Sequence, residues 1–277
     1  MGSRTRGMCV VLGLAVVAGT LPVLAIEGLL RGTEVMNGSA RGTALVMLLV
    51  ALPVLFAGMR AAERSVRGHA VAIGALAYLT YNAMLLVYAT PFNVLFLVSV
   101  ATLGLAFWTL VSALLDPLPL FEPGPDMPVR MIAGFMLVVV TLNALAWVGA
   151  VVPDLGEHPP AFLEGTGLTT NPIYVQDLAF WLPALAVVAV LLWRRTPAGG
   201  FLAGAGLVFW LLEAIGVAVD QVLGHAADPT SPVATLAGAW MFVVLAAVTV
   251  VPLLAWVRAA PAARTARDGS AVPRWRA

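Results

Sequence analysis

Eight stretches of about 20 mostly apolar residues constrain this chain more than any other feature. Each is long enough for a helix to cross a hydrocarbon core ~30 Å thick. Only helices and closed barrels satisfy the backbone in lipid, and apolar runs without alternation favour helices. We therefore predict an all-α fold, a polytopic transmembrane bundle of about eight helices. The predicted spans are residues 8–25, 41–59, 69–90, 92–115, 129–152, 177–193, 200–223 and 233–257.

The composition excludes other classes of protein. The 277 residues are 61% apolar and 10% charged, with a mean hydropathy of +0.97, whereas soluble domains carry about 25% charged residues. Disordered chains are poor in apolar residues, so disorder of the whole chain is also excluded. A net charge of +1 without a clustered basic face gives no sign of a nucleic-acid partner. The single cysteine, Cys9, cannot form an internal disulfide.

The arginines predict the topology. All fifteen basic residues are arginine, and thirteen of them fall on one side of the predicted spans. Only Arg31 and Arg41 fall on the other side, so the positive-inside rule places both termini in the cytoplasm. The absence of lysine suggests GC-rich bacterial coding, and we expect a multi-pass protein of the bacterial cytoplasmic (inner) membrane. Residues 1–25 could alternatively be a cleaved signal peptide, which would leave the remaining topology unchanged.

Proline and arginine distribution divides the chain into four parts. They are a first four-helix half (1–115), a Pro-rich cytoplasmic connection (116–128), a second four-helix half (129–257) and a disordered Arg-rich tail (258–277). Leu-Pro pairs at Leu52-Pro53 and Leu182-Pro183 occupy corresponding helices of the two halves. They suggest an internal duplication, with chance similarity as the alternative.

Glu213 is the strongest candidate for a functional residue. It lies in the middle of an apolar span, where an ionisable group costs about 2.5–3.5 kcal/mol on insertion scales. Asp220 is seven residues further on and returns to nearly the same helix face. Asn82, Asn143 and Glu213 each lie 13 residues from the cytoplasmic start of their helices, about 20 Å up the core. If these faces converge, both asparagines can bind the carboxyl group of Glu213.

Other polar residues suggest an acidic vestibule that opens outward above Glu213. Tyr81 belongs to a tyrosine stripe beside Asn82, and four further candidates lie near the outer surface: Glu27, Asn93, Asp177 and Asp220. The alternative is structural, because interhelical hydrogen bonds of Asn and Glu also hold membrane bundles together. No zinc-ligand spacing, nucleophile elbow, P-loop or dinucleotide fingerprint occurs, so we predict no metal and no cofactor.

Several segments carry a resemblance. Residues 30–35 (LRGTEV), 81–82 (YN) with 93–96 (NVLF), and 171–180 (NPIYVQDLAF) are similar to a family of uncharacterised prokaryotic eight-helix membrane proteins. The resemblance implies eight helices and draws attention to Asn93 and Asp177. It implies no activity.

These patterns favour a small-molecule or ion transporter with Glu213 as its protonatable group. One alternative is an integral membrane enzyme acting on a lipid or isoprenoid, with Glu213 or Asp177 as general acid. Another is a non-catalytic assembly or binding subunit. The expected partners are membrane lipids and a small molecule or ion, and a second copy or a membrane-complex subunit remains open.

Overall fold

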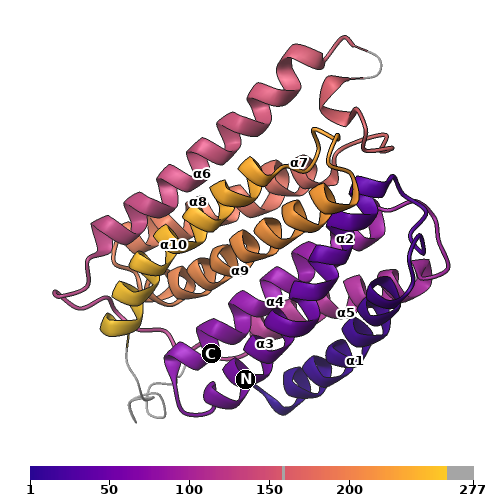
Figure 1. Ribbon diagram of the computed structural model, residues 1–277. Helices are drawn as coiled ribbons and strands as arrows, with labels where there is room; N and C mark the ends of the chain where they lie inside the picture. Colours follow the sequence, from indigo (N-terminus) through magenta and orange to yellow (C-terminus); the bar gives the residue numbers. More distant parts are fainter. Residues whose placement is uncertain (158–159, 261–277) are drawn as a thin grey trace, which may run out of the picture.

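A computed structural model describes residues 1–157 and 160–260 (Figure 1). All regular elements in that part of the chain are helices, and eight helical spans are long and apolar enough to cross a membrane. The predictions of an all-α fold and of eight spans are confirmed for the described residues, and these spans indicate a multi-pass membrane protein. The predicted disordered tail falls mostly on residues 261–277, which lie outside the described residues.

Six spans consist of one long helix each. They are α1 (Ser3–Ala25), α4 (Val66–Tyr88), α5 (Phe96–Leu115), α6 (Val129–Val151), α9 (Pro197–Ala227) and α10 (Leu236–Ala259). Side-chain caps begin three of them: Ser65, Thr196 and Thr235 each accept a hydrogen bond from the backbone N–H three residues on. After α6, the short turns η2 (Val152–Asp154) and η3 (Ala161–Leu163) lead to the sixth span.

The second and sixth spans share an interruption. The second consists of α2 (Glu34–Val46), the π-helical turn η1 (Met47–Ala51) and α3 (Leu52–Ala61); the sixth consists of α7 (Pro172–Gln176), the π-helical turn η4 (Asp177–Trp181) and α8 (Leu182–Trp193). In each span the π turn ends directly before a Leu-Pro pair. Proline lacks an N–H donor and its ring collides with the carbonyl four residues earlier, and a wider turn accommodates both effects. This likeness supports the predicted duplication, which remains a prediction.

Helix α9 is the centre of the bundle and packs against α2, α4, α8 and α10. Glycines allow the closest approach. A Cβ atom at Gly42 of α2 would lie 2.5 Å from the Cα atom of Asp220, and one at Gly38 would collide with the Leu223 carbonyl oxygen. On α4, a Cβ atom at Gly74 would lie 2.6 Å from the carbonyl oxygen of Ala205. Small residues thus bring α2 and α4 against α9, as is common between membrane helices.

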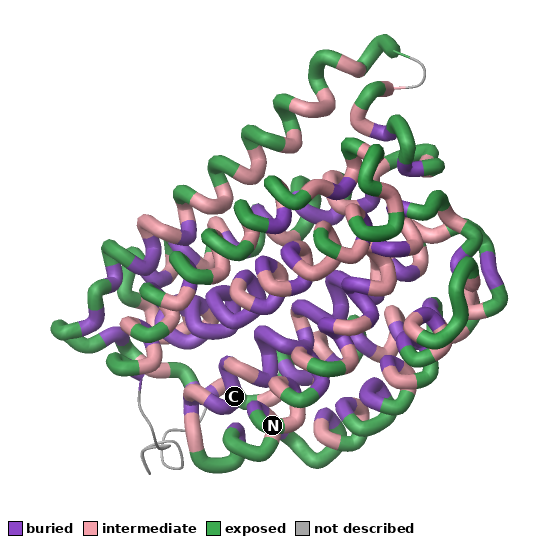
Figure 2. The backbone as a smooth tube through the Cα atoms, viewed as in Figure 1, coloured by how far each residue is buried: buried purple, intermediate pink, exposed green. Residues whose placement is uncertain are grey.

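Helix α6 is peripheral. Its buried residues are Val129, Ile132, Ala133 and Met136, all near its start, and the rest is at least partly exposed (Figure 2). Its main partner is α8, and it has smaller contacts with α10 and, through Phe135 and Trp210, with α9. Most of α6 therefore faces the surroundings of the bundle.

The helix α1 begins and the helix α10 ends at the same end of the bundle, which we call the terminal end; the opposite end is the loop end (Figure 1). The Pro-rich connection is not helical, as expected, and it lies against the second half at the terminal end. Arg195 donates hydrogen bonds to the carbonyl oxygens of Pro123 (3.3 Å) and Gly124 (3.0 Å). Because α2 and α4 pack on α9, the predicted halves interlock, and their division into two units stays a prediction.

Candidate functional site

Asn82 and Glu213 meet across the interface of α4 and α9. The Asn82 Nδ2 atom donates a hydrogen bond to Glu213 Oε2 at 3.0 Å, and it also lies 3.1 Å from the carbonyl oxygen of Tyr78. Asn82 is buried, whereas Glu213 is half-buried. The two residues that the depth argument placed at one level are therefore bonded partners.

Asp220 lies on the same side of α9 as Glu213, one turn beyond Gly216. Gly216 leaves room for the side chain of Tyr78, since a Cβ atom there would lie 2.6 Å from the Tyr78 hydroxyl oxygen. Tyr78 is fully buried, and its hydroxyl group has no hydrogen-bond partner among the described residues. The charges of Glu213 and Asp220 both act on this hydroxyl group. Two carboxyl groups on one face of α9 thus lie near the buried hydroxyl group of Tyr78.

Asp177 brings a third carboxyl group from the π turn of the sixth span. The Trp147 Nε1 atom on α6 donates a hydrogen bond to Asp177 Oδ2 at 2.7 Å, and the Tyr81 hydroxyl group is placed as a second donor. Asp177 is buried with 5% of its surface exposed. Asp177 and Asp220 both interact electrostatically with Glu213. We call these three residues the carboxyl cluster.

Three rings lie directly below the carboxyl cluster, on the side of the terminal end. Tyr81 lies 5.8 Å from both Trp181 and Phe209 between ring centroids, and Trp181 stacks on Phe209 at 4.9 Å. Phe209 is one turn nearer the terminal end than Glu213, and Trp181 is one turn nearer than Asp177. We call these three rings the aromatic layer. Tyr81 and Phe209 belong to the apolar core of the bundle, and Trp181 packs against it.

No arginine is paired with the carboxyl cluster in the described part of the chain. The ion pairs there lie at the two ends of the bundle: Arg6 with Glu63 (2.6 Å) and Arg41 with Glu27 (3.4 Å). An ionised acid at the centre of a bilayer costs about 2.5–3.5 kcal/mol. Protons or a bound cation are therefore the means of neutralising three neighbouring carboxyl groups.

Three predicted site residues lie apart from the carboxyl cluster. Asn143 lies half-exposed on the part of α6 beyond its contact with α9 at Phe135 and Trp210, and the expected bond to Glu213 is not formed. Asn93 shapes the turn into α5, where its Oδ1 atom accepts a hydrogen bond from the Leu95 N–H group at 2.9 Å. Glu27 is exposed and pairs with Arg41. Asp177 and Asp220 therefore lie near Glu213, whereas Glu27 and Asn93 do not, and the outward-opening vestibule stays a prediction.

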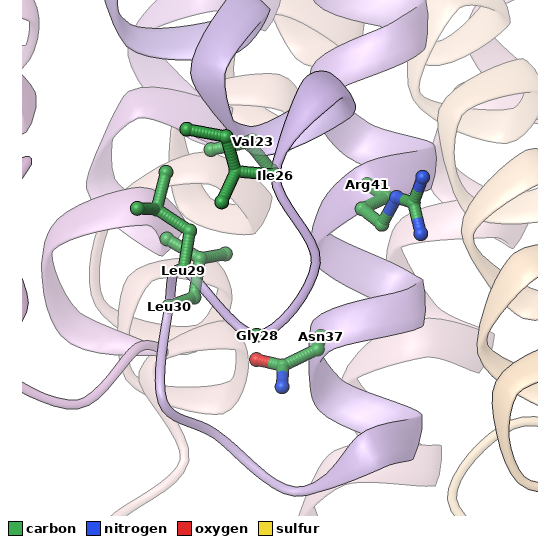
Figure 3. A pocket seen from close by; sticks show the side chains of 7 residues that line it. All are labelled: Val23, Ile26, Gly28, Leu29, Leu30, Asn37 and Arg41. Atoms are coloured by element: carbon green, nitrogen blue, oxygen red, sulfur yellow. The ribbon is translucent and has the colours of Figure 1, made fainter.

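A small pocket lies elsewhere, where α1 leads into α2 at the loop end (Figure 3). Its lining is mostly apolar: Val23, Ile26, Gly28, Leu29, Leu30, Asn37 and Arg41. Its polar groups are occupied, because Asn37 bonds the N–H and carbonyl groups of Gly32 and Arg41 donates to the Leu24 carbonyl oxygen at 3.2 Å. None of the carboxyl cluster lines it. The polar side chains of this pocket thus hold the segment between α1 and α2 in place, and we assign the pocket no binding role.

Sequence reasoning missed two contributors. Trp147 donates a hydrogen bond to Asp177, and no sequence signal pairs these residues, which lie on different helices. Gln176 precedes Asp177, and its Oε1 atom accepts a hydrogen bond from Trp181 Nε1 at 3.2 Å while its buried Nε2 atom has no partner among the described residues. Gly216 could have been noticed, because it lies three residues after Glu213 on the same face.

Within residues 1–157 and 160–260, no group of three or more His, Cys, Asp or Glu side chains is arranged to hold a metal ion. Comparison of the chain with protein-family models, curated proteins and solved structures gave no match. The resemblance to an eight-helix family therefore stays an expectation. Function has to be inferred from the geometry of the carboxyl cluster.

Proposed function

We propose that this protein is a proton-coupled transporter of a small molecule or ion, with Glu213 as the group that takes up and releases the proton. The observation that carries the proposal is the Asn82–Glu213 hydrogen bond inside a membrane bundle, beside two further carboxyl groups and without a paired arginine in the described residues. Ionisable residues within membrane spans usually mark ion paths and proton relays.

The surroundings of Glu213 suit the coupling of proton exchange to the transport of a solute. Asn82 donates to the ionised form of Glu213, and its amide oxygen can accept from the protonated form, so both states have a partner. Glu213 and Asp220 are half-buried, and the proposal needs a route for solute and protons to them. The aromatic layer offers a barrier of packed rings on the other side, and the π turn of η4 next to Pro183 offers a place where the sixth span can bend. A transporter needs such a barrier on one side of its site.

We further propose that the terminal end faces the cytoplasm of a bacterium and the loop end faces outward. The distribution of arginines supports this orientation. It can be tested in cells with single cysteines in a Cys9→Ala background, since Cys9 is the only native cysteine. A membrane-impermeant maleimide should label Glu164→Cys in intact cells and should label Arg64→Cys only after permeabilisation. The reverse pattern would overturn the orientation.

Transport can be tested in sealed vesicles that contain the purified protein and a pH-sensitive dye. An inside-acid pH gradient is imposed, and three solutes are added in turn: a quaternary ammonium cation, an organic anion and a neutral sugar. We expect one class to change the lumenal pH with the wild-type protein. Glu213→Gln should abolish the change, because an amide cannot exchange the proton.

The matched control is Glu164→Gln, which removes an exposed carboxyl group from a loop and should leave the signal unchanged. Thermal unfolding in detergent should show that Glu213→Gln is folded. Proton movement that persists in Glu213→Gln, or no movement with any solute class, would contradict the proposal. A Glu213→Gln protein that fails to fold would favour a structural role instead.

A further inference from the structure

The hydroxyl group of Tyr78 is a buried donor without a partner among the described residues. It is fully buried, lies against α9 at Gly216, and has no hydrogen bond among the described residues. Glu213 and Asp220 stand on either side of Gly216 along the same face of α9. Buried hydroxyl groups in folded proteins are nearly always bonded. The Tyr78 hydroxyl group is therefore an unsatisfied donor next to these two carboxyl groups.

The charge around this hydroxyl group selects a cation. Asp177 and Asp220 both act on Glu213, and no arginine in the described residues offsets them. An anion entering here would be repelled by each ionised carboxyl group. A cation would be attracted and would make the burial of these groups less costly.

The surrounding residues favour an organic cation over a metal ion. Inorganic cations need several oxygen ligands held around one point, and the described residues contain no such group of acids. The aromatic layer instead supplies Tyr81, Trp181 and Phe209 next to the carboxyl groups. Aromatic rings with carboxylates are the usual surroundings of a bound ammonium group.

We propose that the carboxyl cluster binds an organic ammonium compound that also carries an oxygen acceptor, and that this cation exchanges with protons at Glu213. The ammonium group would lie between the carboxyl groups and the aromatic layer, and its oxygen atom would accept the hydrogen bond of Tyr78. This inference rests on the proposed function and names its substrate class. Because one carboxyl group cannot hold a proton and pair with the cation at once, entry of the cation releases a proton.

Binding can be tested on the purified protein without transport. The probes are choline, tetramethylammonium, which lacks the hydroxyl group, and 3,3-dimethylbutan-1-ol, which has the shape of choline without its charge. Choline should raise the thermal unfolding temperature and the neutral alcohol should not. Tyr78→Phe should weaken choline binding by up to about tenfold and leave tetramethylammonium binding unchanged. Glu164→Gln should bind both cations like the wild-type protein.

Transport then separates this inference from the proposed function. In vesicles with an acid lumen, external choline should make the lumen more alkaline, and Glu213→Gln should stop this. Equal stabilisation by the neutral alcohol would overturn the inference, as would the absence of binding by both cations. If the anion or the sugar moves protons in a Glu213-dependent manner, the proposed function stands and the ammonium class is wrong.

Discussion

At the scale of single residues, the Asn82–Glu213 bond has to be weighed against the cost of burying its acid. Hydrogen bonds between membrane helices contribute about 0.6 kcal/mol on average and up to ~1.7 kcal/mol. An acid at the centre of a membrane helix costs about 2.5–3.5 kcal/mol. The bond at 3.0 Å therefore does not offset the burial of Glu213. Stability alone does not explain why this position carries a carboxyl group.

A double-mutant cycle tests that comparison. Asn82→Ala and Glu213→Ala are made singly and together, and unfolding is measured in detergent micelles with increasing dodecyl sulfate. We expect a coupling energy near 0.6 kcal/mol and not above about 1.7 kcal/mol. A coupling of about 3 kcal/mol or more would show that the pair is mainly a structural clamp.

Part of the site could be predicted residue by residue. Helix periodicity and depth along the spans predicted that Asn82 and Glu213 share a level, because both depend on the constant rise of a helix. Asn143 has the same depth, but α6 meets α9 only near its own start, where Phe135 lies against Trp210, and depth carries no information on which helices are neighbours. The contacts of Trp147 and Tyr78 depend on the rotation of each helix about its axis, which a single sequence does not specify.

At the scale of elements, the contact of α2 with α9 ties the fold to the site. Gly42 lies against the backbone of Asp220, so any atom added there pushes directly on the carboxyl cluster. Gly104 of α5 is a suitable contrast, because a Cβ atom there has no neighbour within 4 Å. The two glycines are both helical, and they differ in what surrounds them.

Gly42→Ala should therefore destabilise the protein by about 1–3 kcal/mol, because the colliding atoms are backbone. Gly104→Ala should be neutral or should stabilise by up to about 1 kcal/mol, since alanine is the better helix former. Unfolding in dodecyl sulfate measures both. Equal effects of the two substitutions would mean that α2 does not pack on α9 at this point.

The π turns also belong to this scale. The Leu-Pro pairs were visible in the sequence and suggested a duplication, but the widened turns before Pro53 and Pro183 were not predicted. Proline can also kink or break a helix. Whether a widened turn forms instead depends on whether the neighbouring helices support it. The turn at Asp177 matters more for the site, because Asp177 itself accepts the hydrogen bond of Trp147.

At the scale of the whole molecule, the eight spans follow from hydropathy alone, because lipid demands long apolar helices. Their arrangement does not follow. Lipid is as apolar as the helices, so packing is decided by small residues and polar contacts that a hydropathy profile does not record. The central place of α9 and the peripheral place of α6 are therefore results of the structure.

The lumenal pH of vesicles that contain Glu213→Gln, compared with wild-type vesicles holding the same amount of folded protein, tests the central claim most directly. The claim is that a membrane-embedded carboxyl group, held by Asn82 and neighboured by Asp177 and Asp220, exchanges protons with a transported solute. We predict a solute-dependent pH change with the wild-type protein and none with the variant. The same pH change in both would contradict the claim.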